Sequence, residues 1–196
     1  RKAQSIGAKN LEDYLGPPLV GRDPFQHEHL MELIDYRGNS CAKSGIDMAL
    51  LDLRGRSLGV SVATLIGGAH RDTVRVAIEI PGGPPEMMAA RCVELMASGV
   101  RAFKAKIGGD PDRDSDRLRA IREAVGPHVS LRADANQGYD VKSAIRLCRL
   151  VERHEVDLEL LEQPVRAWDL QGMAAVRRAV DTPIEADESC FSIQDA

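Results

Sequence analysis

The sequence predicts an α/β protein in which a helical segment precedes repeated βα units. The composition changes near residue 70, and from Arg71 onward short apolar runs alternate with amphipathic helix patterns. This alternation is typical of a parallel sheet covered by helices. The units recur at a nearly constant interval, which favours a (β/α) TIM-type barrel over a doubly wound sheet, although periodicity alone leaves both open.

Residues 1–70 form the first predicted domain. A turn-rich stretch at residues 16–24 is followed by apolar residues at helical spacing, first Leu30 and Ile34 and then residues 46–53. We therefore expect helices and no clear strand in this domain.

Residues 71–196 form the second predicted domain, with about five βα units. A closed eight-unit barrel needs about 250 residues, so these units make only part of a barrel. Asp140, Asp169 and the pair Pro84-Pro85 stand where helix caps or first-turn prolines belong. The charge-dense residues 110–122 are expected to form the solvated face of a helix. The expected strands are 74–80, 102–107, 129–135, 158–162 and 183–186, with a helix after each of the first four.

Composition excludes several classes of protein. The chain has 196 residues, 26 Lys+Arg against 30 Asp+Glu, and only 4% aromatic residues, so we expect no nucleic-acid partner. No apolar run approaches the roughly 20 residues that cross a bilayer, so we expect no membrane association. Residues 1–11 are polar and carry no signal-peptide core. With no CxxC spacing, the cysteines are expected to be reduced core residues of a cytoplasmic protein: Cys41, Cys92, Cys148 and Cys190.

Ionisable residues near the carboxyl ends of the expected strands carry the functional information. Asp134, Glu162 and Asp187 follow one another at intervals of 28 and 25 residues, each the length of one βα unit. Three successive strands would therefore deliver one carboxylate each to the same rim. Converging carboxylates repel unless a cation lies among them, and a set of oxygen donors suits Mg²⁺ better than Zn²⁺.

Two lysines extend this prediction to a reaction. Lys104 and Lys106 are two residues apart in one strand, so both point to the same face. Two ammonium groups close together beside a metal destabilise each other's charged forms, so we expect one amine to lose its proton near neutral pH and to act as a base. Lys106 is nearer the strand end and is the expected base, with Lys104 as its charged neighbour. A base opposite a divalent cation indicates abstraction of the proton α to a carboxylate, with the metal stabilising the enediolate.

Each motif also has an ordinary structural explanation. A Lys-x-Lys pair is often a solvated strand edge, and residues 134–138 have the composition of a turn. Residues 162–164 fit a strand stopped by proline, and residues 187–189 fit a capped helix N-terminus. The functional interpretation therefore depends on the joint order and spacing of the motifs.

Four motifs in this order resemble the enolase superfamily, in particular the mandelate racemase/muconate lactonizing enzyme family. They are Lys104-Ala105-Lys106, Asp134-Ala135-Asn136, Glu162-Gln163-Pro164 and Asp187-Glu188-Ser189, and the last is similar to the muconate lactonizing subgroup. Residues 45–55 and 65–68 resemble a helix of the family's α+β capping domain and its junction with the barrel.

The resemblance implies roles for these residues. It implies metal ligation by Asp134, Glu162 and Asp187, with Mg²⁺ as the cofactor and Mn²⁺ as an alternative, and base chemistry by Lys106. Lys104 also belongs to the catalytic set, and the supporting residues are Asn136, Gln163 and Glu188. The resemblance also implies that a second acid/base lysine lies on a strand beyond Ala196, so the choice between one-base and two-base chemistry stays open.

The implied activity is that of a racemase, epimerase or cycloisomerase acting on a small carboxylate substrate, with the full-length protein as a homo-oligomer. Two alternatives remain open. One is a non-catalytic barrel remnant that binds a metal or a partner. The other is an acid-sugar or hydroxy-acid dehydratase of the same superfamily, which would need a histidine on a later strand.

Overall fold

The computed structural model of the chain describes residues 7–36 and 38–196. The chain divides into two compact units, Arg1–Val74 and Arg75–Ala196, which we describe separately. The sequence places this change near residue 70. The expectation for residues 1–6, as part of a polar first segment, lies outside the described residues.

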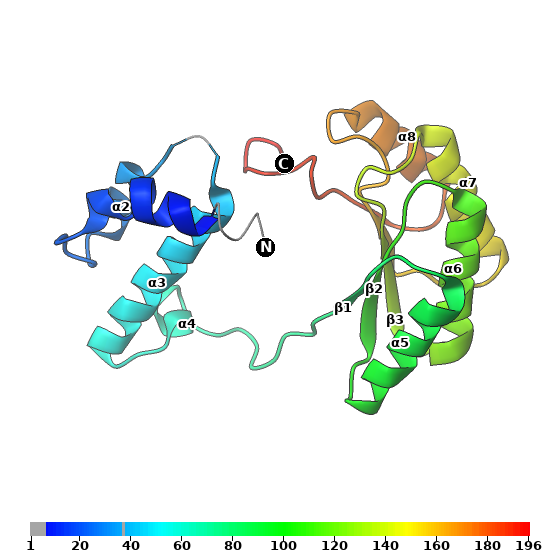
Figure 1. Cartoon of the computed structure of the whole chain (residues 1–196), viewed down its shortest axis with the longest axis horizontal. Helices are drawn as coiled ribbons and strands as arrows, with labels where there is room; N and C mark the ends of the chain where they lie inside the picture. The colour runs from blue at the N-terminus through cyan, green and yellow to red at the C-terminus, as the bar shows by residue number, and fades with distance from the viewer. Residues whose placement is uncertain (1–6, 37) are drawn as a thin grey trace. The chain divides into compact units, whose positions relative to one another are not determined.

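In the described part of the first unit, all regular elements are helical, as the sequence predicts. Leu15, Leu30 and Ile34 are fully buried and pack these short elements together. The longest helix ends at Gly59, whose left-handed backbone (φ 68°) suits a residue without a Cβ. The elements are the π-helix η1 (Leu11–Leu15), the 3₁₀-helix η2 (Pro17–Leu19) and the α-helices α2 (His27–Leu33), α3 (Ser40–Leu58) and α4 (Val62–Leu65) (Figure 1).

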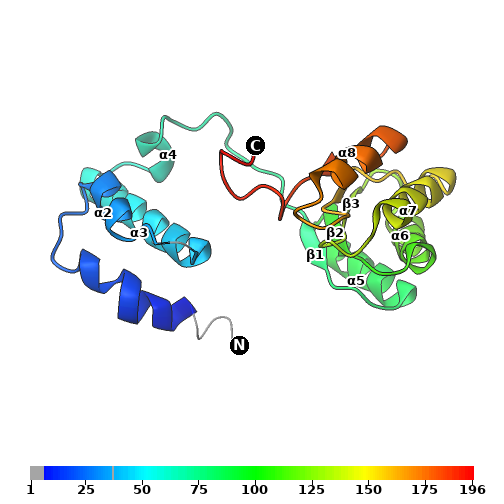
Figure 2. The ribbon, with the colours of Figure 1, turned by 90° about the horizontal axis from the view of Figure 1, so that it is seen from above.

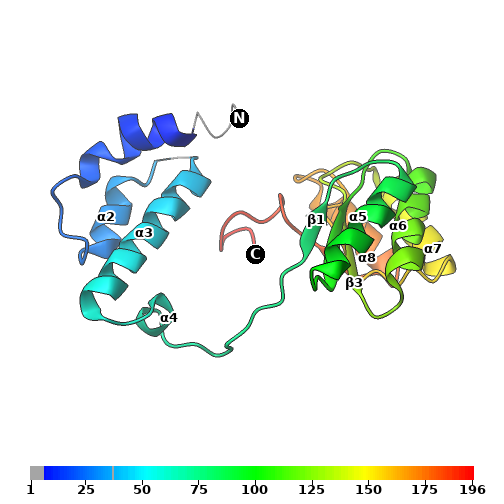
Figure 3. The ribbon, with the colours of Figure 1, turned by 60° about the horizontal axis from the view of Figure 1, so that its bottom comes forward.

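The second unit contains a five-stranded parallel sheet whose strand order follows the chain, β1-β2-β3-β4-β5. Each of the first four strands is followed by a helix, and α5, α6 and α7 lie side by side along one face of the sheet (Figures 2 and 3). This βα repeat confirms the predicted fold class. The strands are β1 (Ile78–Ile80), β2 (Ala102–Lys106), β3 (Ser130–Asp134), β4 (Leu160–Glu162) and β5 (Ile184–Glu185), and the helices are α5 (Pro85–Ala97), α6 (Pro111–Val125), α7 (Val141–Arg153) and α8 (Leu170–Ala179).

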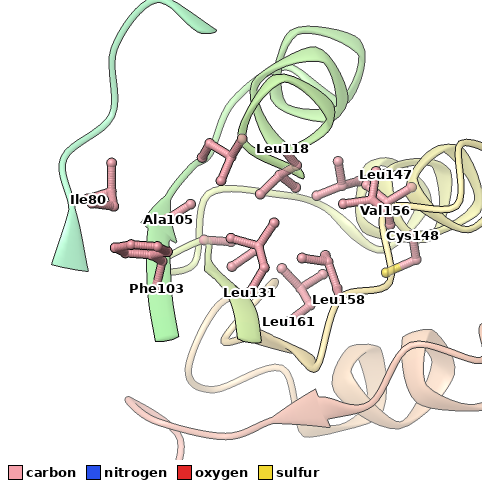
Figure 4. Packing of buried hydrophobic residues seen from close by; sticks show 14 of the residues in the cluster. Ile80, Phe103, Ala105, Leu118, Leu131, Leu147, Cys148, Val156, Leu158 and Leu161 are labelled. Atoms are coloured by element: carbon pink, nitrogen blue, oxygen red, sulfur yellow. The ribbon is translucent and has the colours of Figure 1, made fainter. Parts of the chain in front are cut away.

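The core lies between the sheet and these helices. Because side chains alternate along a strand, Phe103 and Ala105 of β2 point toward the helices while Lys104 and Lys106 point to the opposite face. Phe103 and Ala105 are fully buried. Figure 4 shows these residues packed with others from the neighbouring strands and helices, among them Leu118, Leu131, Leu147 and Leu161. The core therefore uses one face of the sheet, and the lysines on the opposite face are available to form a functional site.

Helix ends follow the predicted signals. The Asp140 carboxylate accepts a hydrogen bond from the Ser143 amide, and that of Asp169 accepts one from the Gly172 amide. Pro85 is the first residue of α5. One cap was not predicted from the sequence: Asp110 accepts hydrogen bonds from two backbone amides at the start of α6, those of Asp112 and Arg113.

Two expectations about burial are partly wrong. The charge-dense residues 110–122 form a helix, but Asp114 is fully buried rather than solvated, because it accepts hydrogen bonds from the loops beside α6. Cys92 and Cys148 are core residues, whereas Cys41 and Cys190 are exposed. Within the described residues, no helix is both long and apolar enough to cross a membrane.

Candidate active site

Charged side chains line one face of the sheet in register. Lys106 pairs across the strands with Asp134, Asp134 with Glu162, and Glu162 with Glu185. These four residues therefore form one layer at the carboxyl ends of β2 to β5. Parallel sheets of βα units place ligand sites at this edge.

Each lysine in β2 faces a carboxylate. The Lys106 Nζ lies 2.6 Å from Asp134 Oδ2 and 3.4 Å from Glu79 Oε2. The Lys104 Nζ lies 3.0 Å from Glu162 Oε2 and 3.4 Å from Asp134 Oδ2. The structure thus brings together both predicted catalytic lysines and two of the three predicted metal ligands.

These ion pairs oppose the expected behaviour of Lys106. Burial lowers the pKa of the Lys106 amine, but the hydrogen bond to Asp134 and the negative charges of Asp134 and Glu79 raise it, and the net pKa lies above its usual value. Lys104 lowers the pKa of Lys106 by repulsion, but this effect is the smallest of those acting on it. In this geometry the carboxylates outweigh the repulsion between the two lysines, and the expectation of a neutral amine beside a bound metal stays a prediction.

The two carboxyl groups respond in opposite directions. Burial raises the pKa of Asp134, but the hydrogen bonds from Lys106 and from the Asn136 amide outweigh it, so the net pKa lies below its usual value. Burial also raises the pKa of Glu162, and the negative charges of Asp134 and Glu185 add to this increase. The hydrogen bond from Lys104 opposes the rise without cancelling it. Of these two carboxyl groups, Glu162 is thus the one whose charged form is less stabilised by its surroundings.

Gln163 connects β4 to the segment that follows β5. Its side chain is fully buried, and its Oε1 accepts hydrogen bonds from the amides of Asp187 (2.9 Å) and Ser189 (3.1 Å). Its Nε2 donates to Ser189 Oγ at 2.8 Å. The backbone of Gln163 lies in the left-handed region (φ 36°), an uncommon conformation for a residue with a Cβ. Gln163 thus fixes the backbone that carries Asp187.

Asn136 and Glu188 meet beside the lysines. The Asn136 Nδ2 donates to Glu188 Oε1 at 3.2 Å, and Asn136 Oδ1 accepts from Lys106 Nζ at 2.9 Å. The Glu188 Oε2 is buried and has no hydrogen-bond partner among the described residues. All three predicted supporting residues therefore lie at this rim.

The predicted convergence of three carboxylates is not assembled. Among the residues that the structure describes, no three His, Cys, Asp or Glu side chains are grouped closely enough to hold a metal ion. Asp187 lies beyond the end of β5 and is exposed. The ammonium groups of Lys104 and Lys106 form ion pairs with the carboxylate oxygens of Glu162 and Asp134. The ligand roles of these three residues stay a prediction.

One charged neighbour of Lys106 escaped the sequence interpretation. Glu79 is the central residue of β1 and pairs with Lys104 across the sheet. The alternation Ile78-Glu79-Ile80 indicates that its side chain lies on the same face as the lysines, and this signal is present in the sequence.

Known proteins resemble both units of the chain. Residues 2–67 match the mandelate racemase / muconate lactonizing enzyme N-terminal domain, and residues 87–196 match the enolase C-terminal domain-like family. An L-Ala-D/L-Glu epimerase from Clostridium acetobutylicum is 39% identical over 95% of this chain and 52% of its own length. Muconate cycloisomerase 1 from Pseudomonas putida is 36% identical over 95% of this chain and 50% of its own length.

A solved structure gives the same result. The dipeptide epimerase from Enterococcus faecalis V583, complexed with Mg and the dipeptide L-Leu-L-Tyr, has a TM-score of 0.87 and 35% identity. The similarity covers 97% of this chain and 53% of that chain. The chain thus spans about half the length of the relatives that it matches.

The successive βα units, with charged residues at the carboxyl ends of the strands, have the architecture of part of a (β/α) barrel. Together with the matches in both units, they show that the chain belongs to the mandelate racemase/muconate lactonizing enzyme family of the enolase superfamily. The relatives named above are isomerases.

Proposed function

We propose that the protein containing this chain is an isomerase that removes the proton α to the carboxylate of a small substrate, as a racemase or epimerase or as a cycloisomerase. The observation that carries the proposal is the cross-strand layer of Lys106, Asp134 and Glu162, with both lysines directed at the carboxylates. The named activities of the relatives, epimerisation and cycloisomerisation, support the same class.

Lys106 is the proposed base. It accepts a proton only in its neutral form, whereas the carboxylates around it favour its charged form. Base chemistry by Lys106 therefore requires that the negative charge of Asp134 be balanced by something other than Lys106. Lys104 remains paired with Glu162 and supplies positive charge beside that carboxylate.

The donor set fits a hard divalent cation. Asp134 and Glu162 are buried cross-strand neighbours, and the buried Glu188 Oε2 is an oxygen without a partner among the described residues. Oxygen donors of this kind suit Mg²⁺, and Mn²⁺ accepts them as well. We propose Asp134, Glu162 and Asp187 as the residues that would hold the ion. Bound there, the ion would neutralise these carboxylates and stabilise negative charge that develops on the substrate.

The test is deuterium exchange at the substrate α-carbon, measured by NMR in D₂O with the complete natural protein, Mg²⁺, and two probes: the dipeptide L-Ala-L-Glu and cis,cis-muconate. Wild-type protein should exchange the α-proton of the dipeptide or convert muconate, and Lys106→Ala should abolish this reaction. Lys142→Ala, which removes an exposed lysine of α7, is the matched control and should retain it.

Retained exchange in Lys106→Ala would refute the assignment of the base. Metal binding without turnover of either probe would instead favour the non-catalytic remnant. The homo-oligomer and the cytoplasmic location remain predictions that size-exclusion chromatography and cell fractionation would test.

A further inference from the structure

A buried carboxylate on α6 joins two loops of the candidate site. The Asp114 side chain is fully buried, and its Oδ2 accepts hydrogen bonds from the Gly108 amide (3.1 Å) and from the Tyr139 hydroxyl. Its Oδ1 accepts from Arg117 Nη1 at 2.6 Å. Asp114 therefore satisfies both oxygens, and two of its three donors come from loops outside its own helix.

These two loops follow the strands that carry the proposed base and the first proposed ligand. Gly108 comes two residues after Lys106, and Tyr139 comes three residues after Asn136. The loops also touch through their backbones, because a Cβ added to Gly138 would lie 2.9 Å from the Gly108 Cα. The Tyr139 amide donates to the Pro164 carbonyl at 3.0 Å, which extends the connection to the loop after β4.

Burying a carboxylate between a helix and loops costs desolvation free energy, which strong hydrogen bonds or ion pairs must offset. Here the compensation consists of hydrogen bonds with fixed directions to the two loops. Burial and the hydrogen bond to Asp114 raise the pKa of the Tyr139 hydroxyl, so Tyr139 remains a donor to Asp114 across the ordinary pH range.

We propose that Asp114 is a positioning residue, which holds the loops after β2 and β3 against each other and so fixes Lys106 and Asn136 relative to the substrate. This inference rests on the function proposed above. Displacement of a catalytic group by about 1 Å costs up to about 100-fold in rate, so a clamp at this point has a direct effect on turnover.

The amide variant Asp114→Asn tests the clamp with little change in volume. In one orientation, the Asn amide group faces the Gly108 N–H, and in the other it faces the Arg117 guanidinium, so a donor meets a donor in both. Tyr139→Phe is the milder variant, because it removes one donor and leaves the Gly108 hydrogen bond in place. Asp116→Asn, on the exposed face of the same helix, is the matched control.

Two measurements on the complete natural protein decide the proposal. Amide hydrogen exchange followed by mass spectrometry reads the loops at residues 107–110 and 136–140 without any substrate. Steady-state deuterium exchange at the α-carbon of L-Ala-L-Glu reads kcat and KM separately. We expect Asp114→Asn to exchange amides at least 10-fold faster in both loops and to lower kcat about 10- to 100-fold, while KM changes less than 3-fold. Tyr139→Phe should show a smaller effect of the same kind, and Asp116→Asn none.

Unchanged amide exchange in both loops of Asp114→Asn would overturn the clamp. An equal loss of kcat in Asp116→Asn would overturn it as well. The amide-exchange measurement does not depend on turnover. If wild-type protein acts on no carboxylate probe, the proposed function fails. Faster amide exchange in Asp114→Asn that is confined to these two loops still supports the clamp.

Discussion

Arg122 connects the amino-terminal ends of the βα units through four backbone carbonyl groups. Its guanidinium donates to the carbonyls of Gly126, Val129 and Val156 at 2.7 Å each and to that of Asp157 at 3.0 Å. Burial lowers the pKa of Arg122 from its usual value, but an arginine so far above neutrality stays charged. We predict that Arg122→Met destabilises the second unit because it leaves these carbonyls without their donor.

The magnitude follows from the number of hydrogen bonds. A hydrogen bond contributes about 1 kcal/mol net, so four give about 4 kcal/mol. Part of this loss is recovered because Arg122 is only half-buried and water reaches some of the carbonyls, which leaves about 3 kcal/mol. With a urea dependence of about 2 kcal/mol per molar, the unfolding midpoint should fall by about 1.5 M.

The assay is urea unfolding of the complete natural protein, followed by far-UV circular dichroism. Arg119→Met is the matched control, because Arg119 lies on the exposed face of the same helix and forms only surface ion pairs. Its midpoint should shift by less than about 0.5 M, as surface pairs contribute about 0–1 kcal/mol. Equal midpoints for the two variants would refute the reasoning about the carbonyl groups.

Three further predictions concern the second unit. Hydrogen bonds from Arg132 and Ser130 lower the pKa of Glu159 from 4.5, so its stabilising contribution is present above pH 4.5 and is lost as the pH falls through the lowered value. Glu159→Gln should therefore lower the urea midpoint of unfolding at pH 7. A difference in midpoint between wild type and variant that persists at pH 2 would contradict this. Gly138→Ala should lower the free energy of unfolding by about 1–3 kcal/mol, because the new Cβ would lie 2.8 Å from the backbone oxygen of Ala135. An unchanged urea midpoint would show that the loop backbone moves to accept the Cβ without loss of stability. Burial raises the pKa of Cys92 to about 11 and that of Cys148 to about 12. Neither thiol should therefore react with a disulfide reagent at pH 8 until the protein is unfolded. Peptide mapping of the labelled sites would test this.

The order and type of elements were predictable because hydrophobic periodicity reports them directly. Alternation in residues 102–107 separates the lysines of β2 from the core residues Phe103 and Ala105, and the structure has this arrangement. The spacing of Asp134 and Glu162 by one βα unit likewise predicted their neighbouring positions. These inferences require only that a strand alternates and that parallel strands end at one edge.

Other features depend on tertiary contacts that periodicity does not contain. The partner of each lysine is set by distances across the sheet, so the raised pKa of Lys106 was not accessible from sequence spacing. Asp114 stands in a charge-dense segment, where nothing distinguishes a buried carboxylate from its solvated neighbours. Asp187 lies past the end of β5, where the hydrogen bonds of Gln163 determine the path of the chain.

The agreement between strand order and chain order has a kinetic consequence. Each strand pairs with the strand that precedes it in the chain, as Asp134 does with Lys106 and Glu162 with Asp134, each pair being 28 residues apart. At about 5–20 residues per second, a ribosome adds such a stretch in about 1–6 seconds, far longer than a helix or a short loop needs to form. Each unit thus has time to dock on its predecessor during synthesis. Lys104 and Lys106 are made before Asp134 and Glu162, so the growing sheet gains these two buried carboxylates after the lysines that pair with them.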